Sequence, residues 1–438
     1  MCPDMLSGLR LVLIFQLTFS AVLPAQQISM EEAYSVLVPA RPASAEQPRP
    51  SGLKGRVMTG YQGWFRAEGD GSGMGFYHYE KRGKFEPGAC TIDLWPDLSG
   101  FDEDEKFATP FKNSDGSTAH VFSSIVPKTV NRHFEWMRDY GIDGAFVQRF
   151  AVVGAKEHRS FSHLKSDNQK LILARDSANA NGRCYALMYD LSGLVSDDFE
   201  RLARDWKMLR TRMKLGTDPN DRAYLQHNGK PLVAIWGVGF NDKRGYDLKD
   251  AEEFIRLLKN NPEWGGMSIM LGVPFGWREQ VRDAITDPRF HEVLKLADVI
   301  SPWSIGRYHQ VDFKSGKHVT NLIEDRQWCE KNQIDYLPVL YPGFSWHNLT
   351  GDPLNAIPRR KGKFLWEQFI ATRAAGIESA YIAMFDEVDE GTAIFKCTNN
   401  PPTGKGATFL DYEGLPSDHY LRLTQKGGHL LRGEIPIE

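Results

Sequence analysis

Tyr140-Gly-Ile-Asp-Gly-Ala145 and Ala375-Gly-Ile-Glu-Ser-Ala380 are two short stretches that follow the same pattern in distant parts of the chain. In each, a glycine closes a segment of helical periodicity, and the residues after it begin an apolar run. This pattern is typical of a helix that ends at a glycine and leads into a buried strand. Its recurrence predicts that one helix–strand unit is repeated along the chain.

Eight short apolar runs have the length and composition of strands that are buried in a parallel sheet. They are Val57–Tyr61, Gly144–Phe150, Cys184–Asp190, Pro231–Trp236, Met267–Val273, Val299–Ser301, Tyr336–Tyr341 and Ser379–Phe385. From the second run onward, successive runs begin 32 to 47 residues apart. A βαβ unit needs about 30 residues or more, so each of these intervals has room for one helix and its loops.

Three of the intervals contain a clear helical pattern. The first helix is predicted to begin at Thr129 and to end at Gly141, with Val130, Phe134 and Met137 on its apolar face. A second is predicted to follow Ser196, and a third, which includes Leu365 and Phe369, is predicted to end at Gly376.

Eight such units predict an α/β fold, a (β/α)₈ TIM-type barrel that forms a single domain over residues 53–438. The alternative is a doubly wound open sheet, but no glycine-rich nucleotide turn follows the first strand. The first interval is much longer than the others, so residues Gln62–Lys128 are predicted to be a large insertion after strand 1. Its acidic run, Asp102–Glu105, lacks the spacing of a calcium loop and is expected to be a solvated loop.

The N-terminus has the pattern of an export signal. Arg10 precedes the apolar segments Leu11–Phe15 and Leu17–Leu23, which are too short for a membrane span of about 20 residues. We therefore expect residues 1–25 to be a signal peptide, and the mature protein to be secreted or periplasmic and without a membrane span. Residues 26–52 are rich in proline and alanine and are expected to be a linker with a short helix at Met30–Leu37.

The composition excludes several classes of partner. The chain has 53 basic and 56 acidic residues and a formal charge of −3, which argues against nucleic acid as the main partner. Its five cysteines are widely spaced and form no Cys-x-x-Cys pair, so no zinc site is predicted and at most one disulfide is expected. Neither a metal nor a cofactor is predicted. The 11 tryptophans are more than a core needs and are suited to stacking on sugar rings.

In barrels of this kind the active site lies at the C-terminal ends of the strands. The residues at those ends are mostly aromatic or acidic, and we regard the following as candidates for substrate binding: Tyr61, Trp64, Gln148, Arg149, Tyr189, Asp190, Trp236, Trp303, Arg307, Tyr308, Tyr341, Trp346 and His347. Each also fits a structural role; Trp236, for example, is equally suited to packing and Arg149 to pairing with an acid. Aromatic walls with carboxyl groups are the elements that glycosidic bond cleavage uses.

The segment after the last strand places four carboxyl groups within five positions: Asp386, Glu387, Asp389 and Glu390. Crowded carboxylates raise one another's pKa, which favours a proton donor near neutral pH. The alternative is a solvated acidic turn or a helix N-terminus, where acids are also favoured. Their position directly after a buried strand indicates a catalytic role.

The stretch Phe385-Asp-Glu-Val-Asp-Glu-Gly-Thr392 resembles the Phe-Asn-Glu-Trp-x-Glu-Gly-Thr motif of glycoside hydrolase family 99, and Gly60–Phe65 is similar to the aromatic start of the same group. The resemblance covers about Gly55 to Lys396 and extends to bacterial family 71/99-like proteins, some labelled xylosidase or arabinosidase. It implies an exported hydrolase of α-linked oligo- or polysaccharides on a (β/α)₈ barrel.

By the same resemblance, Glu387 and Glu390 are the catalytic pair. Glu387 would be the base that takes the proton of the sugar 2-hydroxyl, giving a 1,2-anhydro intermediate. Glu390 would be the acid that protonates the leaving oxygen and then the base that activates water. Tyr61 would bind near the reacting sugar, and Asp386 and Asp389 are further candidates for substrate contact.

The sequence departs from the family motif at three positions: Asp386 replaces Asn, Val388 replaces Trp, and Asp389 stands where the family more often has His. These departures leave two alternatives to a hydrolase. One is a carbohydrate-binding barrel protein that has lost catalysis. The other is a metal-dependent lyase or hydrolase with Asp386, Asp389 and Glu390 as oxygen ligands. Resemblance to family 71 would instead imply an α-1,3-glucan substrate and inversion.

Overall fold

The computed structural model of the protein describes residues 28–41, 49–156, 161–311 and 316–437. The predicted signal peptide, Cys2 and residues 42–48 of the predicted linker lie outside these ranges. In the described ranges, no helix combines the length and apolar character required to cross a bilayer. Cys90, Cys184, Cys329 and Cys397 are buried free thiols.

The main sheet is a curled and mostly parallel sheet. Its hydrogen-bonded order is β10-β9-β8-β7-β5-β4-β1-β12-β11. These strands are β1 (Val57–Tyr61), β4 (Gly144–Phe150), β5 (Cys184–Asp190), β7 (Lys230–Trp236), β8 (Ser268–Val273), β9 (Val299–Pro302), β10 (Asp335–Tyr336), β11 (Val339–Leu340) and β12 (Ala380–Ile382). One short strand, β6 (Gln226–His227), pairs antiparallel with β7. The parallel order of these strands confirms the prediction of an α/β barrel.

The two edges of the sheet meet on one stretch of chain. β10 pairs with β9 and β11 pairs with β12, and only Leu337 and Pro338 separate β10 from β11. Leu337 donates its N–H to the carbonyl of Ile300 at 2.9 Å, and the Pro338 carbonyl accepts from Tyr381 at 2.9 Å. Sequence analysis predicted one strand here. Proline has no N–H to give to a ladder, which accounts for the interruption.

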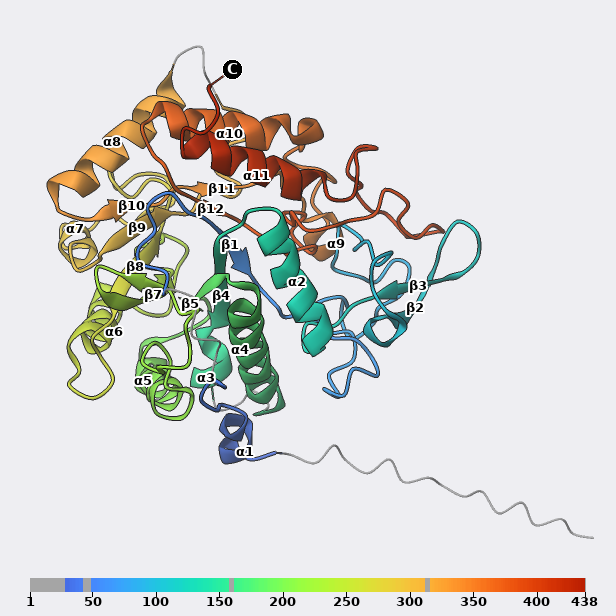
Figure 1. Cartoon of the computed structure of the whole chain (residues 1–438), viewed down its shortest axis with the longest axis horizontal. Coiled ribbons are helices and arrows are strands. Elements are labelled where there is room, and N and C mark those ends of the chain that lie inside the picture. The colour runs from blue at the N-terminus through green and yellow to red at the C-terminus, as the bar shows by residue number, and fades with distance from the viewer. Residues whose placement is uncertain (1–27, 42–48, 157–160, 312–315, 438) are drawn as a thin grey trace, which may run out of the picture.

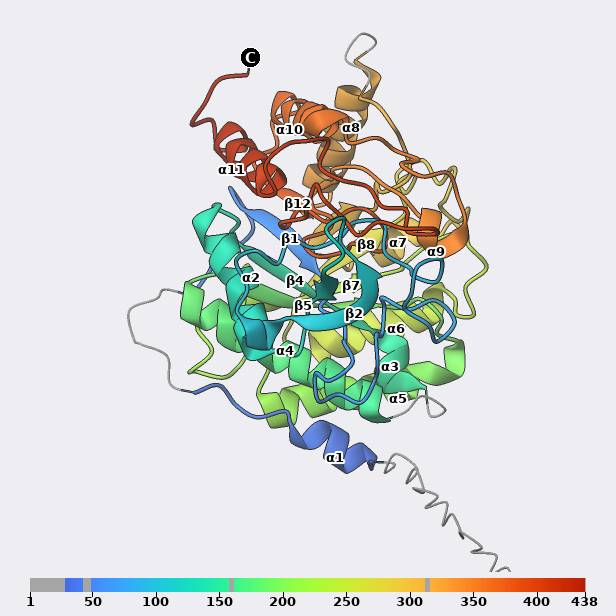
Figure 2. The same ribbon diagram turned by 90° about the vertical axis from the view of Figure 1, so that its right-hand side faces the viewer.

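Helices surround the sheet on its outer side (Figures 1 and 2). They are α1 (Met30–Ser35), α2 (Pro127–Asp139), α3 (Ala151–Ala155), α4 (Phe161–Asn181), α5 (Phe199–Met208), α6 (Leu248–Asn260), α7 (Phe290–Leu294), α8 (Lys317–Lys331), α9 (His347–Thr350), α10 (Lys363–Ala374) and α11 (His419–Leu431), with short helical turns at Glu103–Glu105, Ser196–Asp198, Leu209–Met213 and Arg360–Gly362. Gly141 (φ 64°) and Gly376 (φ 72°) end α2 and α10 in the left-handed region, as the repeated sequence pattern predicts.

The chain between β1 and α2 carries a two-stranded antiparallel ribbon of β2 (Phe107–Lys112) and β3 (Thr118–Val121). Figure 1 shows this ribbon beside the loops that follow β12. In the chain before the ribbon, Leu94 forms a β-bridge with Leu410, which lies in the region after β12. In the acidic run, Asp102 and Asp104 are exposed as expected. Glu105, in contrast, is buried and its carboxylate lies 2.6 Å from Arg132.

Side chains of the strands alternate between the interior of the barrel and the layer beneath the helices. Methionines are prominent in the interior, where Met58, Met188, Met270 and Met384 belong to one buried cluster. Gly60 of β1 is required for this packing, since a Cβ there would lie 2.2 Å from the Met384 sulfur. The interior below the strand ends is thus filled with side chains.

The region before β1 packs on the barrel where it is described. α1 lies against α4, and the Tyr34 hydroxyl donates a hydrogen bond to Asp205 at 2.7 Å. The Ala40 N–H donates to Asp218 at 2.6 Å. This part of the predicted linker therefore contacts the barrel through Tyr34 and Ala40.

Arg149 lies in the layer between the sheet and the helices. Its guanidinium donates to both oxygens of Asp205, at 2.6 and 2.8 Å, and the Tyr34 and Tyr189 hydroxyls also donate to Asp205. Both charged side chains are buried. Removal of one partner of such a pair leaves an uncompensated charge in the core.

We predict that Asp205→Ala lowers the free energy of unfolding by about 3–5 kcal/mol, measured by urea denaturation. Asp197→Ala, at an exposed position on the preceding turn, is the matched control and should change stability by less than about 0.5 kcal/mol. Equal stability of the two variants would contradict this account of the buried pair.

Candidate active site

Two adjoining cavities lie at the C-terminal ends of the strands. The central cavity has a volume of about 530 Å³ and is lined by residues that include Gln148, Asp190, Trp236, Trp303, Trp346 and Glu387. The side cavity has a volume of about 850 Å³ and is lined by residues that include Arg66, Tyr77, His78, Asp167, Lys170 and Asp389. Gln62, Trp64, Phe150, Ser192 and Glu390 line both. The two cavities are therefore neighbouring parts of one hollow.

The acidic segment after β12 is held from both sides by backbone contacts. Val388 is fully buried, and its carbonyl accepts hydrogen bonds from the N–H groups of Asp93 and Leu94. The buried Arg359 guanidinium donates to the carbonyls of Gly391 and Ala393, both at 2.7 Å. These contacts fix the backbone that carries the carboxyl groups.

Asp386 joins this segment to the end of β1. Its two carboxylate oxygens accept the backbone N–H groups of Gln62 and Gly63, each at 2.8 Å. Asn, the residue of the family 99 motif, has a single side-chain acceptor and would satisfy these two donors less well. Burial raises the pKa of Asp386 to about 6, although the two backbone donors act in the opposite direction.

Glu387 has a hydrogen-bond donor on each oxygen. The Gln62 side-chain amide donates to Oε1 at 2.6 Å, and the Thr392 hydroxyl donates to Oε2 at 2.8 Å. Burial raises the pKa of Glu387 well above its ordinary value, and the neighbouring carboxyls of Glu390 and Asp389 raise it further. The two donors favour the ionised form and oppose this rise.

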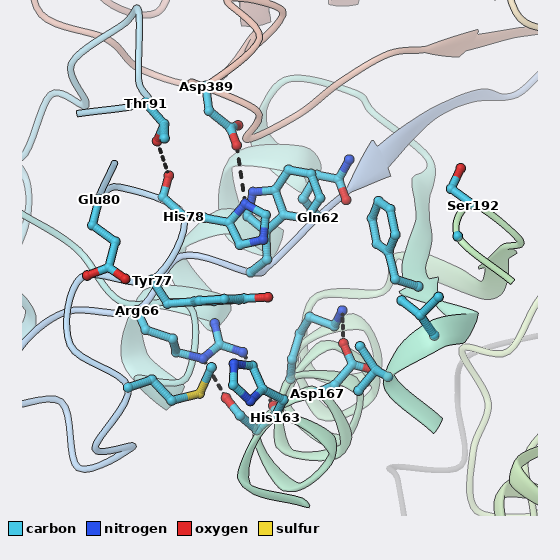
Figure 3. A pocket seen from close by; sticks show the side chains of 18 of the residues that line it. Gln62, Arg66, Tyr77, His78, Glu80, Thr91, His163, Asp167, Ser192 and Asp389 are labelled. Carbon is cyan, nitrogen blue, oxygen red and sulfur yellow. Dashed lines mark hydrogen bonds and ion pairs between the residues drawn. The ribbon is translucent and has the colours of Figure 1, made fainter. Parts of the chain in front are cut away.

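Asp389 is buried and Glu390 is half-buried, and the carboxyl groups of both have raised pKa values. Burial raises the pKa of Glu390 to about 8, and the charge of Asp389 adds to the effect. Burial likewise raises the pKa of Asp389 to about 8. Asp389 lies 3.3 Å from Nδ1 of His78, and the His78 ring stacks on Trp64 at a centroid distance of 3.9 Å (Figure 3). At neutral pH, Glu390 is therefore able to donate a proton.

Four tryptophans surround the carboxyl groups. Trp64, Trp236, Trp303 and Trp346 all line the central cavity, and Trp236 and Trp303 meet edge to face at 5.5 Å. The indole N–H groups of Trp64 and Trp236 are buried and have no acceptor among the residues that the structure describes. Such rings and donors are suited to the apolar faces and hydroxyls of sugars.

The structure brings together ten of the predicted site residues around the two cavities: Trp64, Gln148, Asp190, Trp236, Trp303, Arg307, Trp346, Glu387, Asp389 and Glu390. Seven others do not line either cavity: Tyr61, Arg149, Tyr189, Tyr308, Tyr341, His347 and Asp386.

Strand alternation accounts for three of these seven. The Tyr61 hydroxyl bonds to His133 of α2 at 3.0 Å, and Arg149 and Tyr189 both contact Asp205 behind the sheet. Because successive side chains of a strand point to opposite faces, Gln148 and Asp190 reach the hollow while their neighbours cannot.

The other four also have partners of their own. Tyr308 donates to Gln368 at 2.9 Å, and the Tyr341 hydroxyl bonds to the Tyr308 carbonyl. His347 Nδ1 lies 2.8 Å from the carbonyl of Asp352. Asp386 accepts the backbone N–H groups of Gln62 and Gly63, so it positions the loop after β1 and does not reach the hollow.

Among the cavity and site residues that were not predicted, three contact the carboxyl groups of the acidic segment through their side chains: Gln62, Thr392 and His78. Gln62 and Thr392 both contact Glu387. Gln62 follows Tyr61 directly and Thr392 is two residues after Glu390. Their position after a strand could therefore have indicated that they belong to the site. His78 lies in the long segment after β1 and comes to the site only through the fold of that segment. No pattern in the sequence indicates its position.

Comparison with solved structures identifies proteins of the same fold. Two structures of the GH99 endo-alpha-mannosidase from Bacteroides thetaiotaomicron are similar: one, in complex with bis-tris propane, has a TM-score of 0.60 at 16% identity, and the other has a TM-score of 0.58 at 18% identity. Each of the two alignments covers 87% of this chain and 98% of the matched mannosidase chain. A glycoside hydrolase-like protein has a TM-score of 0.50 at 11% identity, over 91% of this chain and 99% of the other.

No family model and no curated protein matches the chain. The resemblance to family 99 that the sequence indicates is thus confirmed at the level of the fold, with structural neighbours described as glycoside hydrolases.

The raised pKa of Glu390 predicts how stability depends on pH. The folded protein keeps a proton on Glu390 up to about pH 8, whereas the unfolded chain loses it near the ordinary value of 4.5. The folded state therefore binds more protons in this range, and stability falls as pH rises from 4.5 to 8.

We predict that Glu390→Gln, which cannot ionise, reduces the loss of melting temperature between these two pH values. Differential scanning calorimetry at a series of pH values measures the effect. Glu378→Gln, at a half-exposed position where the carboxylate pairs with Lys54, is the control and should keep the wild-type slope. An unchanged slope in Glu390→Gln would show that Glu390 ionises normally.

Proposed function

We propose that this protein is an exported glycoside hydrolase that cleaves α-linked glycans with Glu387 and Glu390 as its acid–base pair. The observation that carries the proposal is the convergence of a buried carboxyl group, Glu387, and a half-buried one, Glu390, on a hollow walled by tryptophans. The fold shared with an endo-alpha-mannosidase supports it, and the apolar N-terminus supports export. We also propose that β10 and β11 together form one strand, which gives the barrel eight strands.

The hydrogen bonds of the two glutamates support different roles. Glu387 accepts from Gln62 and Thr392 on its two oxygens, and an amide N–H can only donate. These two donors favour the ionised form of Glu387, although burial and the neighbouring carboxyls raise its pKa well above the ordinary value. For Glu390, burial is the main cause that raises the pKa to about 8. The two donors on Glu387 support it as the base, and the raised pKa of Glu390 supports it as the acid.

In the proposed reaction, Glu387 takes the proton of the sugar 2-hydroxyl, and that oxygen attacks the anomeric carbon to give a 1,2-anhydro sugar. Glu390 gives its proton to the leaving glycosidic oxygen. In the second half, Glu390 takes a proton from water, whose oxygen opens the anhydro ring, and Glu387 returns the proton to the 2-oxygen. The net change is hydrolysis, with both glutamates restored.

The departures from the family motif are compatible with this role. Val388 is fully buried against Asp93 and Leu94, so its change from Trp alters packing beneath the site. Asp386 holds the loop that presents Gln62. Since both Asp386 oxygens already accept backbone N–H groups, the arrangement does not favour the alternative in which Asp386 is a metal ligand.

We predict that Glu387→Gln and Glu390→Gln each lower kcat on a cleaved α-linked polysaccharide by about 10²- to 10⁴-fold while the melting temperature is retained. Glu378→Gln is the matched control and should keep full activity. The assay is release of reducing ends from a panel of α-linked polysaccharides. Binding without any new reducing ends in the wild-type protein would favour the carbohydrate-binding alternative.

The anhydro route makes a separate prediction, because it needs a free 2-hydroxyl on the reacting sugar. We expect a substrate that is methylated at that oxygen to bind but to remain uncleaved. Product analysis by NMR is the measurement, with the same substrate methylated at a distant hydroxyl as the control. Cleavage of the 2-O-methyl substrate would instead favour direct attack on the anomeric carbon by Glu387 or by water.

A further inference from the structure

The side cavity carries a group of cations that the proposed reaction does not use. Arg66, Lys170 and Asp167 line it, and Arg149 lies directly behind Asp167. Figure 3 shows Arg66 and Asp167 on one side of this cavity, with Asp389 on the opposite side. These cations are therefore gathered around Asp167, and the acidic segment lies on the opposite side.

Asp167 is the shared counter-ion of the basic side. Its Oδ1 lies 2.5 Å from Lys170 Nζ, and its Oδ2 lies 2.5 Å from Arg149. Burial alone would raise the pKa of Asp167, but the charges of Lys170 and Arg149 outweigh burial and lower it. Arg149 is also paired with Asp205. With Arg66, this cluster has three cations and two carboxylates, which leaves one positive charge in excess.

Arg66 is the cation without a carboxylate partner. Its side chain is almost fully buried, with 3% of the residue exposed. It donates to the Ser166 hydroxyl at 2.6 Å and to the carbonyls of Gly63 and Phe65 at 2.9 Å. Among the residues described, it makes no ion pair with a carboxylate. Burial lowers its pKa, and the surrounding negative charge does not offset this effect.

Two neighbouring carboxylates do not neutralise this excess at close range. Asp70 acts on Arg66 from a distance, and its own oxygens accept from Ala67, Ser72 and Ser123. Glu80 also lines the cavity, and no ion pair joins it to Arg66 in the part of the chain that the structure describes.

The opposite side contributes little negative charge at neutral pH. Burial raises the pKa values of Asp389 and Glu390 to about 8, so both are largely protonated there. The remaining cation of the lining, Lys156, already pairs with Asp198 at 2.6 Å. The side cavity is therefore positive at the end formed by Arg66 and Lys170.

We propose that the side cavity is a subsite for an acidic sugar, one that bears a carboxylate or a sulfate group, and that Lys170 and Arg66 attract its anionic group. The inference rests on the proposed function for the identity of the ligand as a glycan. Because Gln62, Trp64 and Glu390 line both cavities, a chain bound at the catalytic pair can extend into this subsite. The substrate class would then be an acidic α-linked polysaccharide.

The test measures binding without turnover. Glu387→Gln protein, whose altered residue does not line the side cavity, is titrated with three matched oligosaccharides: a neutral one, its uronate-containing counterpart and its O-sulfated counterpart. We expect one of the acidic forms to bind about tenfold more tightly than the neutral form, as one charge-assisted contact provides. Which acidic form binds distinguishes a carboxylate from a sulfate as the recognised group.

The variant that tests the cations is Lys170→Met in the same background. It removes the excess charge and leaves Asp167 paired with Arg149, so no carboxylate is left unpaired. It should abolish the preference for the acidic form. Lys165→Met, on the same helix and paired with Glu32 at the surface, is the matched control and should keep it. If Lys170→Met does not fold, Lys170→Gln is tested for the same loss of preference, because its side chain can still donate to the Gln148 carbonyl.

Equal affinity for the neutral and acidic forms would overturn the proposal, and so would full acidic preference in both Lys170 variants. Binding of no acidic oligosaccharide would overturn it as well. Failure of the proposed function has a different signature. In that case the wild-type protein would bind acidic oligosaccharides through Lys170 and release no reducing ends from them.

Discussion

The site depends on one constraint: one segment carries three buried carboxyl groups and a fourth that is half-buried, and the hydrogen-bond donors around them are mainly neutral. Asp386 accepts two backbone N–H groups, and Glu387 accepts from an amide and a hydroxyl. No lysine or arginine of the described chain forms an ion pair with any of the four. In these surroundings the pKa values of Asp389 and Glu390 are raised to about 8, so both hold protons at neutral pH. This places proton donors beside tryptophans that can bind sugar rings.

The barrel supplies the rigidity that this arrangement needs. Asp386 ties the end of β12 to the end of β1, which are neighbours in the sheet, and the long segment after β1 covers the acidic segment through Asp93 and Leu94. Arg359 fixes the other end of the same segment. The segment that carries the carboxyl groups is therefore held by hydrogen bonds from distant parts of the chain, and the oxygens of Asp386 and Glu387 take part in these or similar bonds.

Much of the barrel could be predicted from the sequence because strand length and periodicity are local properties. Val57–Tyr61, Gly144–Phe150 and Cys184–Asp190 are strands with the predicted bounds. The site was predictable only in part. The rule that sites lie at strand ends identifies a position along the chain, but the face on which a side chain lies decides whether it reaches the hollow. Gln148 and Arg149 are adjacent, yet one lines the cavity and the other pairs with Asp205 behind the sheet.

His78 shows the second limit of sequence analysis. Its contact with Asp389 joins residues from opposite ends of the chain, and no local pattern specifies it. The most direct measurement on the site is a ¹³C NMR titration of the glutamate side-chain carboxyls, with the Glu390 resonance assigned by its loss in Glu390→Gln. The account predicts that this carboxyl titrates near pH 8. Titration near 4.5, its ordinary value, would contradict the claim that burial holds a proton on Glu390 for catalysis.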